Sequence, residues 1–210
     1  MEILFARHGN TFRPGDRVVW VGRETDLPLV EKGEQQAAAA AEALHRTGRS
    51  PEIIFAASLS RTRRFAEIVA DRFGGVETVI DPRLDEIDYG RWANRTNDEI
   101  AAEGPDAQAA MQAWGDRDVW PSNAGWISRQ ADIRKAVADF VADRLTPPVT
   151  RRVLVVSSNG ILRFLPRAVL PTGALDRPSF KMRTGGLGVV ERDAAVSRLV
   201  CWDVKAEDFI

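Results

Sequence analysis

Short apolar runs alternate along the chain with longer stretches in which apolar residues recur at helical spacing. The runs at residues 3–6, 52–56, 78–80 and 153–156 predict strands, of which the last is the clearest buried one. Between them, residues 31–46, 58–73 and 128–145 predict helices. The chain ends with the pattern of a β-hairpin, at residues 187–191 and 196–204. This alternation predicts an α/β sandwich with a mostly parallel sheet.

Several residues mark where the predicted helices begin or bend. A serine is available as N-cap for the 58–73 helix, and Ser128 for the 128–145 helix. Thr96 and Glu99 have the spacing of a capping box, which predicts a short helix after residue 96. A further helix is predicted from residue 161 to Pro171, with a kink at Pro166.

Two segments lack a periodic pattern. Residues 13–29 contain two prolines and two glycines, and they predict a loop that lies over the end of the first strand. Residues 111–126 hold Trp114, Trp120 and Trp126. These tryptophans form an aromatic wall around an organic substrate, or they pin a long loop to the core, which is the commoner use of such residues.

Composition narrows the class of protein. The chain has 210 residues with 44% hydrophobic and 28% charged side chains, which predicts one globular domain over residues 1–210. Lys plus Arg (29) nearly balance Asp plus Glu (30), so overall charge gives no argument for nucleic acid or an anionic membrane as partner. With no leader-like or membrane-spanning stretch, we expect a cytoplasmic protein. The oligomeric state is left open.

Cysteine and histidine are scarce. Cys201 lies alone in an apolar run, which predicts a buried structural thiol. The two histidines and this cysteine are far apart in the sequence, so we expect no metal site and no cofactor. His45, in the last turn of a predicted helix, is expected at the surface.

The candidate chemistry begins at Arg7-His8-Gly9, directly after the first predicted strand. In open α/β sheets ligands bind at that edge. The arrangement suits His8 as a nucleophile towards phosphorus, with Arg7 holding the phosphoryl oxygens. Gly9 allows a sharp turn or a close approach to a ligand. Arg61, in the first turn of the helix after the second strand, adds a guanidinium to free backbone N–H groups, a common combination for binding anions.

Several motifs occur in order along nearly the whole chain. They are Arg7-His8-Gly9-x-Thr11, Asp26-x-Pro28-Leu29 with Gly33, Gln36 and Ala37, Leu59-x-Arg61, Leu84-x-Glu86-x-x-x-Gly90-x-Trp92, and the strand at 153–156 followed by Gly160 and Arg163. Together they resemble the histidine phosphatase superfamily, also called the phosphoglycerate mutase-like family. The resemblance implies a three-layer α/β/α sandwich and phosphoryl transfer through a phosphohistidine without a metal ion.

Site roles follow from the resemblance position by position. His8 would be the nucleophile, Glu86 the proton donor to the leaving oxygen, and Arg7 and Arg61 the phosphoryl ligands. The chemistry agrees, because a neutral imidazole attacks phosphorus without a separate base and guanidinium groups bind phosphoryl oxygens bidentately. A carboxyl group with a raised pKa can protonate an alkoxide. The implied partner is a small phosphorylated molecule.

The chain departs from the family pattern at one essential place. Ser158 stands where members normally carry a second histidine, and Asn159 where a glycine is usual. Pro14, Ala57-Ser58, Phe65 and the segment from Gly125 to Ser128 are smaller departures. Loss of one preorganised hydrogen-bond donor typically lowers a rate by about 10²–10³. Ser158 and the Asn159 amide can donate neutral hydrogen bonds to phosphate in partial compensation. The sequence thus favours a phosphomonoesterase of weak or narrowed activity.

Other functions stay open. A catalytically impaired pseudoenzyme would use Arg7, His8 and Arg61 to bind a phosphorylated ligand. A serine hydrolase using Ser158 is the weaker alternative, because Val156 stands where its elbow motif needs glycine. A phosphatase is favoured over a mutase, since a mutase must retain and return the phosphoryl group. The sequence does not identify the natural substrate.

Overall fold

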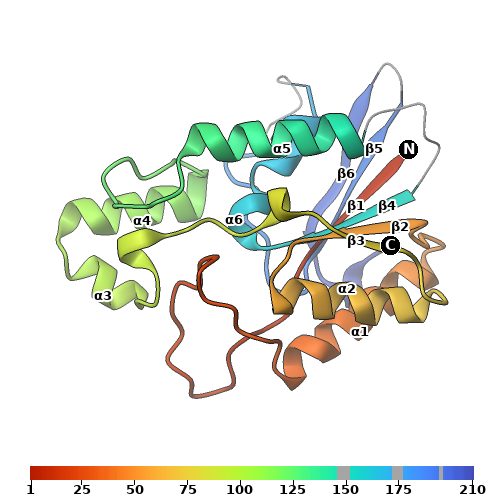
Figure 1. Ribbon diagram of the computed structural model, residues 1–210, viewed down its shortest axis with the longest axis horizontal. Helices are drawn as coiled ribbons and strands as arrows, with labels where there is room; N and C mark the ends of the chain where they lie inside the picture. Colours follow the sequence, from red (N-terminus) through yellow and green to blue (C-terminus); the bar gives the residue numbers. More distant parts are fainter. Residues whose placement is uncertain (146–151, 172–176, 194–195) are drawn as a thin grey trace.

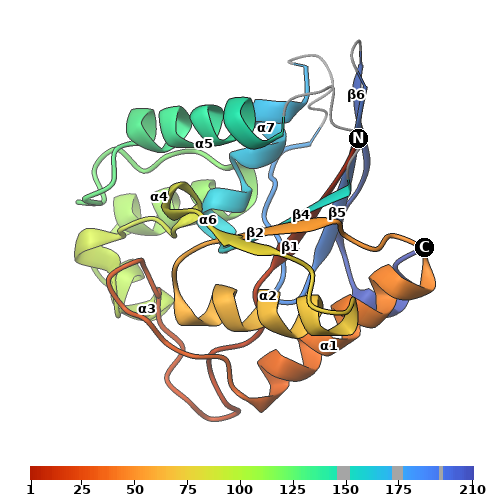
Figure 2. The ribbon, with the colours of Figure 1, turned by 45° about the vertical axis from the view of Figure 1, so that its right-hand side comes forward.

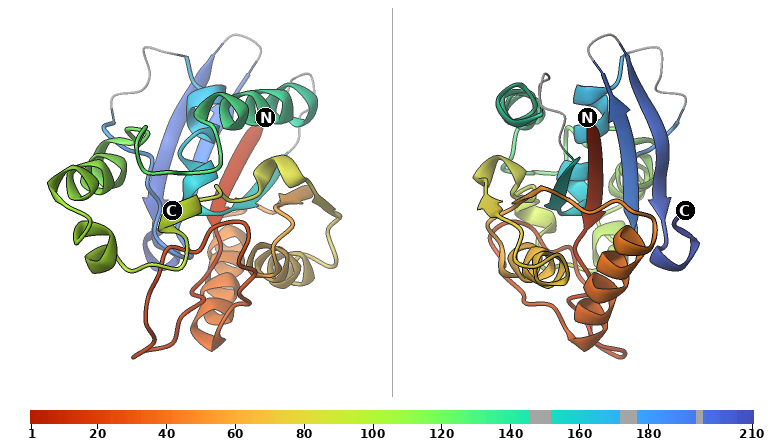
Figure 3. Two further views of the ribbon diagram at one scale, coloured as in Figure 1. Left: turned by 60° about the vertical axis from the view of Figure 1, so that its left-hand side comes forward. Right: turned by 90° about the vertical axis from the view of Figure 1, so that its right-hand side faces the viewer.

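The computed structural model describes residues 1–145, 152–171, 177–193 and 196–210. In this part of the chain a six-stranded sheet has the order β3-β2-β4-β1-β5-β6. The strands are β1 (Glu2–Arg7), β2 (Ile53–Ala56), β3 (Thr78–Ile80), β4 (Arg152–Ser157), β5 (Leu187–Arg192) and β6 (Ser197–Val204). The first four are mutually parallel, and β5 is antiparallel to both neighbours. The predicted mostly parallel sheet and its terminal hairpin, drawn in blue at the sheet edge in Figure 3, are confirmed.

Helices cover both faces of this sheet, which makes the fold a three-layer α/β/α sandwich. Helices α1 (Glu31–Arg46) and α2 (Ser60–Arg72) lie on one face, and α5 (Gln130–Arg144), α6 (Asn159–Leu162) and α7 (Leu165–Val169) on the other (Figures 1 and 2). Successive side chains of β1 point to opposite faces of the sheet. Ile3 and Phe5 join the hydrophobic cluster on the α5 side, and Leu4 and Ala6 join the cluster under α1 and α2. The three-layer architecture that the resemblance implied is confirmed.

The segment between β3 and α5 holds a helix that the sequence pattern did not predict. Two 3₁₀ helices, Pro82–Leu84 and Gly90–Trp92, precede α3 (Asn97–Ala101) and α4 (Pro105–Arg117). α3 begins with the predicted capping box of Thr96 and Glu99. α4 was missed because the stripe that it packs on the core, Ala107, Ala110, Met111 and Trp114, consists mostly of small or partly buried residues, which give a weak apolar pattern.

Three expectations for helix ends were wrong. The N-cap of α2 is Leu59, and the carboxylate of Asp26 instead accepts hydrogen bonds from the backbone N–H (2.7 Å) and the hydroxyl (2.6 Å) of Ser60. Ser128 lies one residue before the N-cap of α5, and its hydroxyl accepts from the Asp88 N–H. The predicted kinked helix is two helices, since Pro166 lies in the first turn of α7, where a missing N–H is tolerated.

Residues expected outside any site lie as follows. His45 is exposed near the end of α1, as predicted. Cys201 is only half-buried in β6, and burial raises the pKa of its thiol. Among the residues that the structure describes, no helix combines the length and apolar character needed to cross a membrane.

Candidate active site

The carboxyl ends of β1 and β4 bring the first candidate residues together. In the parallel register Arg7 lies opposite Ser157, and the backbone N–H of His8 donates to the Ser157 carbonyl at 3.2 Å. His8 and Ser158 are therefore the first residues beyond two neighbouring strands. This is the edge at which parallel α/β sheets bind ligands.

Gly9 is needed here for packing against α1. A Cβ on Gly9 would lie 2.3 Å from the carbonyl oxygen of Gly33, and a Cβ on Gly33 would lie 2.2 Å from the carbonyl oxygen of Asn10. Two backbones without side chains thus touch where the chain leaves β1. The close approach of Gly9 foreseen from the sequence is an approach to α1, and it fixes where His8 sits.

His8 is held in one tautomer. Its Nδ1 lies 2.8 Å from the carbonyl oxygen of Gly9, and because a carbonyl only accepts, Nδ1 carries the proton. The lone pair is then on Nε2. Burial, together with the positive charges of Arg7 and Arg61, holds the pKa of His8 well below its usual value of 6.5. The imidazole is therefore neutral at physiological pH, which is the nucleophilic form.

Two guanidinium groups flank this imidazole. Arg7 donates from Nη1 to the Met182 carbonyl at 2.8 Å, while its Nε is buried without a partner. Arg61 is 1% exposed and donates to the carbonyls of Thr25 (3.0 Å) and Gly22 (3.3 Å). Burial lowers the pKa of both arginines, and the nearby Glu86 raises it in part. Since an arginine stays charged in proteins, both groups are cations that share Glu86 as an electrostatic partner, and Asp26 and Asp85 also act on Arg61.

Glu86 is positioned by bonds from both neighbouring strand ends. The Ser157 hydroxyl donates to the Leu84 carbonyl at 2.7 Å, and the Ser58 N–H donates to the Asp85 carboxylate at 2.6 Å. These bonds fasten residues 84–86 to the ends of β4 and β2. A loop acid from a distant part of the sequence thereby reaches the edge where His8 lies.

The Glu86 carboxyl is buried and keeps its proton to a higher pH than an exposed glutamate does. It accepts from the backbone N–H groups of Ile87 (2.9 Å) and Gly160 (3.2 Å). Burial raises its pKa, and these hydrogen bonds with the charges of Arg61 and Arg7 oppose part of the rise. A carboxyl group in this condition can donate a proton near neutral pH.

Ser158 and Asn159 stand at the start of α6. Ser158 is fully buried, and its hydroxyl has no hydrogen-bond partner. Such a group costs free energy unless a ligand satisfies it. The side-chain carbonyl of Asn159 accepts from the Met182 N–H at 2.9 Å, so half of this amide holds the segment that also binds Arg7. The amide's NH₂ half is the part left for an anion.

Comparison with known proteins supports the resemblance seen in the sequence. Residues 3–205 match the model of the histidine phosphatase superfamily (branch 1).

The chain belongs to this superfamily.

Curated relatives within it include the probable phosphoglycerate mutase GpmB of Erwinia tasmaniensis, 28% identical, and that of Salmonella arizonae, 34% identical. Both alignments cover 91% of this chain and 85% of the relative. Among solved structures, a mycobacterial glucosyl-3-phosphoglycerate phosphatase with VO3 is 28% identical with a TM-score of 0.74, covering 97% of this chain and 99% of the other. The α-ribazole phosphatase of Shigella flexneri shares the fold with a TM-score of 0.70 at 22% identity, covering 97% and 96%.

One residue of the candidate site was not singled out from the sequence. Tyr89 is 4% exposed, its hydroxyl is hydrogen-bonded to Glu86, and burial places its pKa well above 10. It is the only tyrosine of the chain and lies three residues after Glu86 within the same motif. That position was the available signal, but only the fold shows that the two side chains meet.

The loop at residues 13–29 lies against the candidate site, as expected. Its carbonyls bind Arg61, and Trp20 packs edge-on against Tyr89 with ring centroids 5.1 Å apart. Trp126 contacts Trp20, Tyr89, Trp92, Trp114 and Trp120. The tryptophans pack on one another and on the core, which favours the pinning role over an aromatic wall.

Proposed function

We propose that this chain is a phosphomonoesterase that works through a phosphohistidine on His8 and needs no metal ion. The observation that carries the proposal is the His8 hydrogen bond to the Gly9 carbonyl, which leaves Nε2 unprotonated beside Arg7 and Arg61. Membership of the superfamily and the likeness to phosphatase structures support the same chemistry.

The first step transfers the phosphoryl group to the protein. Nε2 of neutral His8 attacks phosphorus, the ester P–O bond breaks, and Glu86 gives its proton to the departing alkoxide. Arg7 and Arg61 stabilise the charge on the phosphoryl oxygens. The raised pKa of Glu86 and the lowered pKa of His8 each shift the group towards the protonation state that this step needs.

The second step returns the enzyme to its starting state. A water molecule attacks the phosphohistidine while the Glu86 carboxylate takes one of its protons. The P–N bond breaks, inorganic phosphate leaves, and both groups recover their starting protonation states. Every proton and electron pair is thus accounted for by two side chains and water.

Ser158 makes the activity weak or narrowed. Its buried, unpartnered hydroxyl supplies one neutral hydrogen bond to the phosphoryl group, with the Asn159 NH₂ beside it. A charged histidine at position 158 would also stabilise the negative charge of the phosphoryl group. Without that histidine, the rate is lower by about 10²–10³. We expect the partner to be a small phosphorylated molecule, and hydrolysis rather than return of the phosphoryl group.

Turnover of p-nitrophenyl phosphate and p-nitrophenyl acetate by four proteins tests the proposal. The wild type should hydrolyse the phosphate ester, His8→Ala should lose the activity, and Ser158→His should raise it. Phosphate binding without any turnover in the wild type or in Ser158→His would favour the pseudoenzyme. Acetate turnover that disappears with Ser158→Ala would favour the serine hydrolase.

A further inference from the structure

A basic cavity is lined by residues other than His8, Arg7, Arg61 and Glu86, although the charge of its Arg163 also acts on Arg7. Its volume is about 340 Å³, and it forms where the end of α4, the first turns of α5 and the junction of α6 with α7 meet (Figures 1 and 2). Its lining residues are Arg117, Asp118, Gln130, Arg134, Arg163, Phe164 and Arg167. None of these is a residue to which we assign phosphoryl transfer.

The cavity holds far more positive than negative charge. Four arginines line it against one carboxylate, that of Asp118. That carboxylate is fully committed: it accepts from Arg163, from Arg167 (3.0 Å), from the Ser179 hydroxyl (2.6 Å) and from the Phe180 N–H (2.7 Å). It therefore has little capacity left to neutralise the other arginines.

The remaining donors lack acidic partners. Within the described part of the chain, Arg117 and Arg134 make no ion pair, and Arg134 lies over the Phe164 ring at 5.9 Å. Arg163 is 2% exposed, and its Nε is buried without a hydrogen-bond partner. An unpaired N–H of a buried guanidinium is costly, so an acceptor that reaches it would be bound with a gain in free energy.

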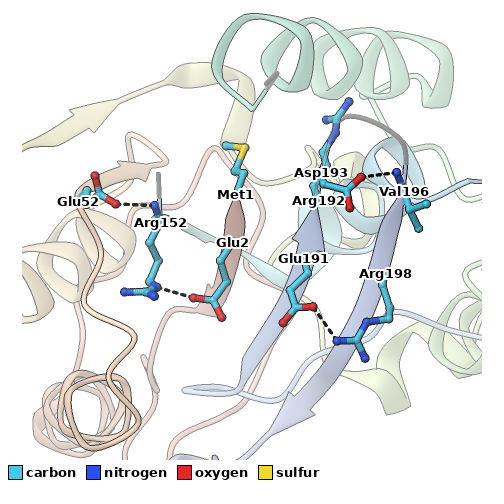
Figure 4. A pocket seen from close by; sticks show the side chains of 9 residues that line it. All are labelled: Met1, Glu2, Glu52, Arg152, Glu191, Arg192, Asp193, Val196 and Arg198. Atoms are coloured by element: carbon cyan, nitrogen blue, oxygen red, sulfur yellow. Dashed lines mark hydrogen bonds and ion pairs between the residues drawn. The ribbon is translucent and has the colours of Figure 1, made fainter. Parts of the chain in front are cut away.

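A larger cavity elsewhere in the molecule shows the contrast. It has about 620 Å³ and lies around the start of β1, at the end of this strand away from His8 (Figure 4). There Arg152 pairs with Glu2 and Arg198 with Glu191 at 2.6 Å. Arginine and carboxylate alternate in that cavity, so its charge is balanced. In the basic cavity beside α5, by contrast, the arginines outnumber the carboxylates.

We propose that the basic cavity lined by Arg117, Arg134, Arg163 and Arg167 binds a compact polyanion of the phosphate type. This site is separate from the one that carries out phosphoryl transfer. The guanidinium groups come from α4, α5 and α7 and from the C-cap of α6, and such groups match phosphate oxygens in geometry and charge. The free N–H groups of the first turn of α5, which has no side-chain cap, add further donors on the same side. Inorganic pyrophosphate is the simplest probe of this chemistry.

An NMR titration with pyrophosphate locates the binding. In the wild type, the amide signals of Gln130 and Arg134 and the Nε–H signal of Arg163 should shift and saturate. Arg134→Glu and Arg117→Glu should each lower the affinity for pyrophosphate by about tenfold or more, since the loss of one charge-assisted contact has an effect of that size. Both side chains are exposed, so the fold tolerates the change.

Lys135→Glu is the matched control. It makes the same change of charge on the neighbouring residue of α5, but Lys135 does not line the cavity, and it pairs with Asp139. It should keep the wild-type affinity within about twofold. Equal weakening in all three variants would reduce the effect to overall charge and overturn the proposal. Shifts confined to residues near His8 would overturn it as well.

Discussion

The carboxyl group of Glu86 lies directly against the backbone of Gly160. The Gly160 N–H donates to Oε2 at 3.2 Å, and a Cβ at position 160 would lie 2.2 Å from Oε1 and 2.8 Å from the Tyr89 hydroxyl. The first turn of α6 thus packs directly against the Glu86 carboxyl group. Only a residue without a side chain leaves that room.

Gly160→Ala should therefore displace the proton donor. We expect kcat for p-nitrophenyl phosphate to fall by about 10²-fold, within the usual range for a lost general acid. Gly115→Ala is the control, because Gly115 lies in α4 with no heavy atom near enough to meet a Cβ. It should leave kcat unchanged and stabilise the protein by roughly 0.5–1 kcal/mol. Unchanged kcat in both variants would mean that Glu86 does not donate the proton.

The pH dependence of kcat/KM should be bell-shaped. Activity should fall as the pH drops through the pKa of His8, which burial and the two arginines hold well below 6.5, because the protonated imidazole cannot attack. It should fall again as the pH rises through the pKa of Glu86, which burial raises above 4.5, because the carboxylate has no proton to give. Glu86→Gln should lower the rate and abolish the alkaline limb. A limb that persists in this variant belongs to another group.

Stability should separate the two buried serines at the end of β4. Ser158→Ala removes a hydroxyl without a partner, and the free energy of unfolding should rise by about 1 kcal/mol. Ser157→Ala removes the hydrogen bond to Leu84, and the free energy of unfolding should fall by about 1–2 kcal/mol. Denaturant unfolding of both variants gives the comparison.

Phosphate binding supplies the second half of that test. Ser158→Ala should bind inorganic phosphate less tightly than the wild type, although it is more stable. A Ser158→Ala protein that is destabilised as much as Ser157→Ala, with unchanged phosphate affinity, would give Ser158 a structural role only.

Asp26 should support both α2 and the phosphoryl site. It binds the N–H and the hydroxyl of Ser60, and the adjacent Thr25 carbonyl holds Arg61. Asp26→Ala should lower the free energy of unfolding by about 1–2 kcal/mol, as the loss of a helix cap does, and raise KM several-fold. In the same loop, Asp16→Ala removes only a local bond to the Arg13 N–H and should change neither quantity much. Thermal unfolding and steady-state kinetics measure both.

The sequence by itself determined the strands, most helices and the family. Buried strands such as 153–156 and an alanine-rich helix such as 31–46 can be predicted directly, because burial imposes apolar residues at fixed periods. Arg7, His8 and Arg61 could be named because each lies at or after the end of a strand in a known motif. α4 could not be predicted, since Ala107, Ala110 and Met111, which pack on the core beside Trp114, are small or only partly buried and give a weak apolar pattern.

Only the tertiary structure decided how these residues act. Whether a histidine is neutral depends on burial and on cations that other elements bring near, as α2 brings Arg61 near His8. The capping of α2 by Asp26, the contact of Gly160 with Glu86 and the four arginines beside α5 all join residues distant in sequence. Local propensity acts within a few residues, whereas desolvation, charge and close packing are set by whatever the fold brings near.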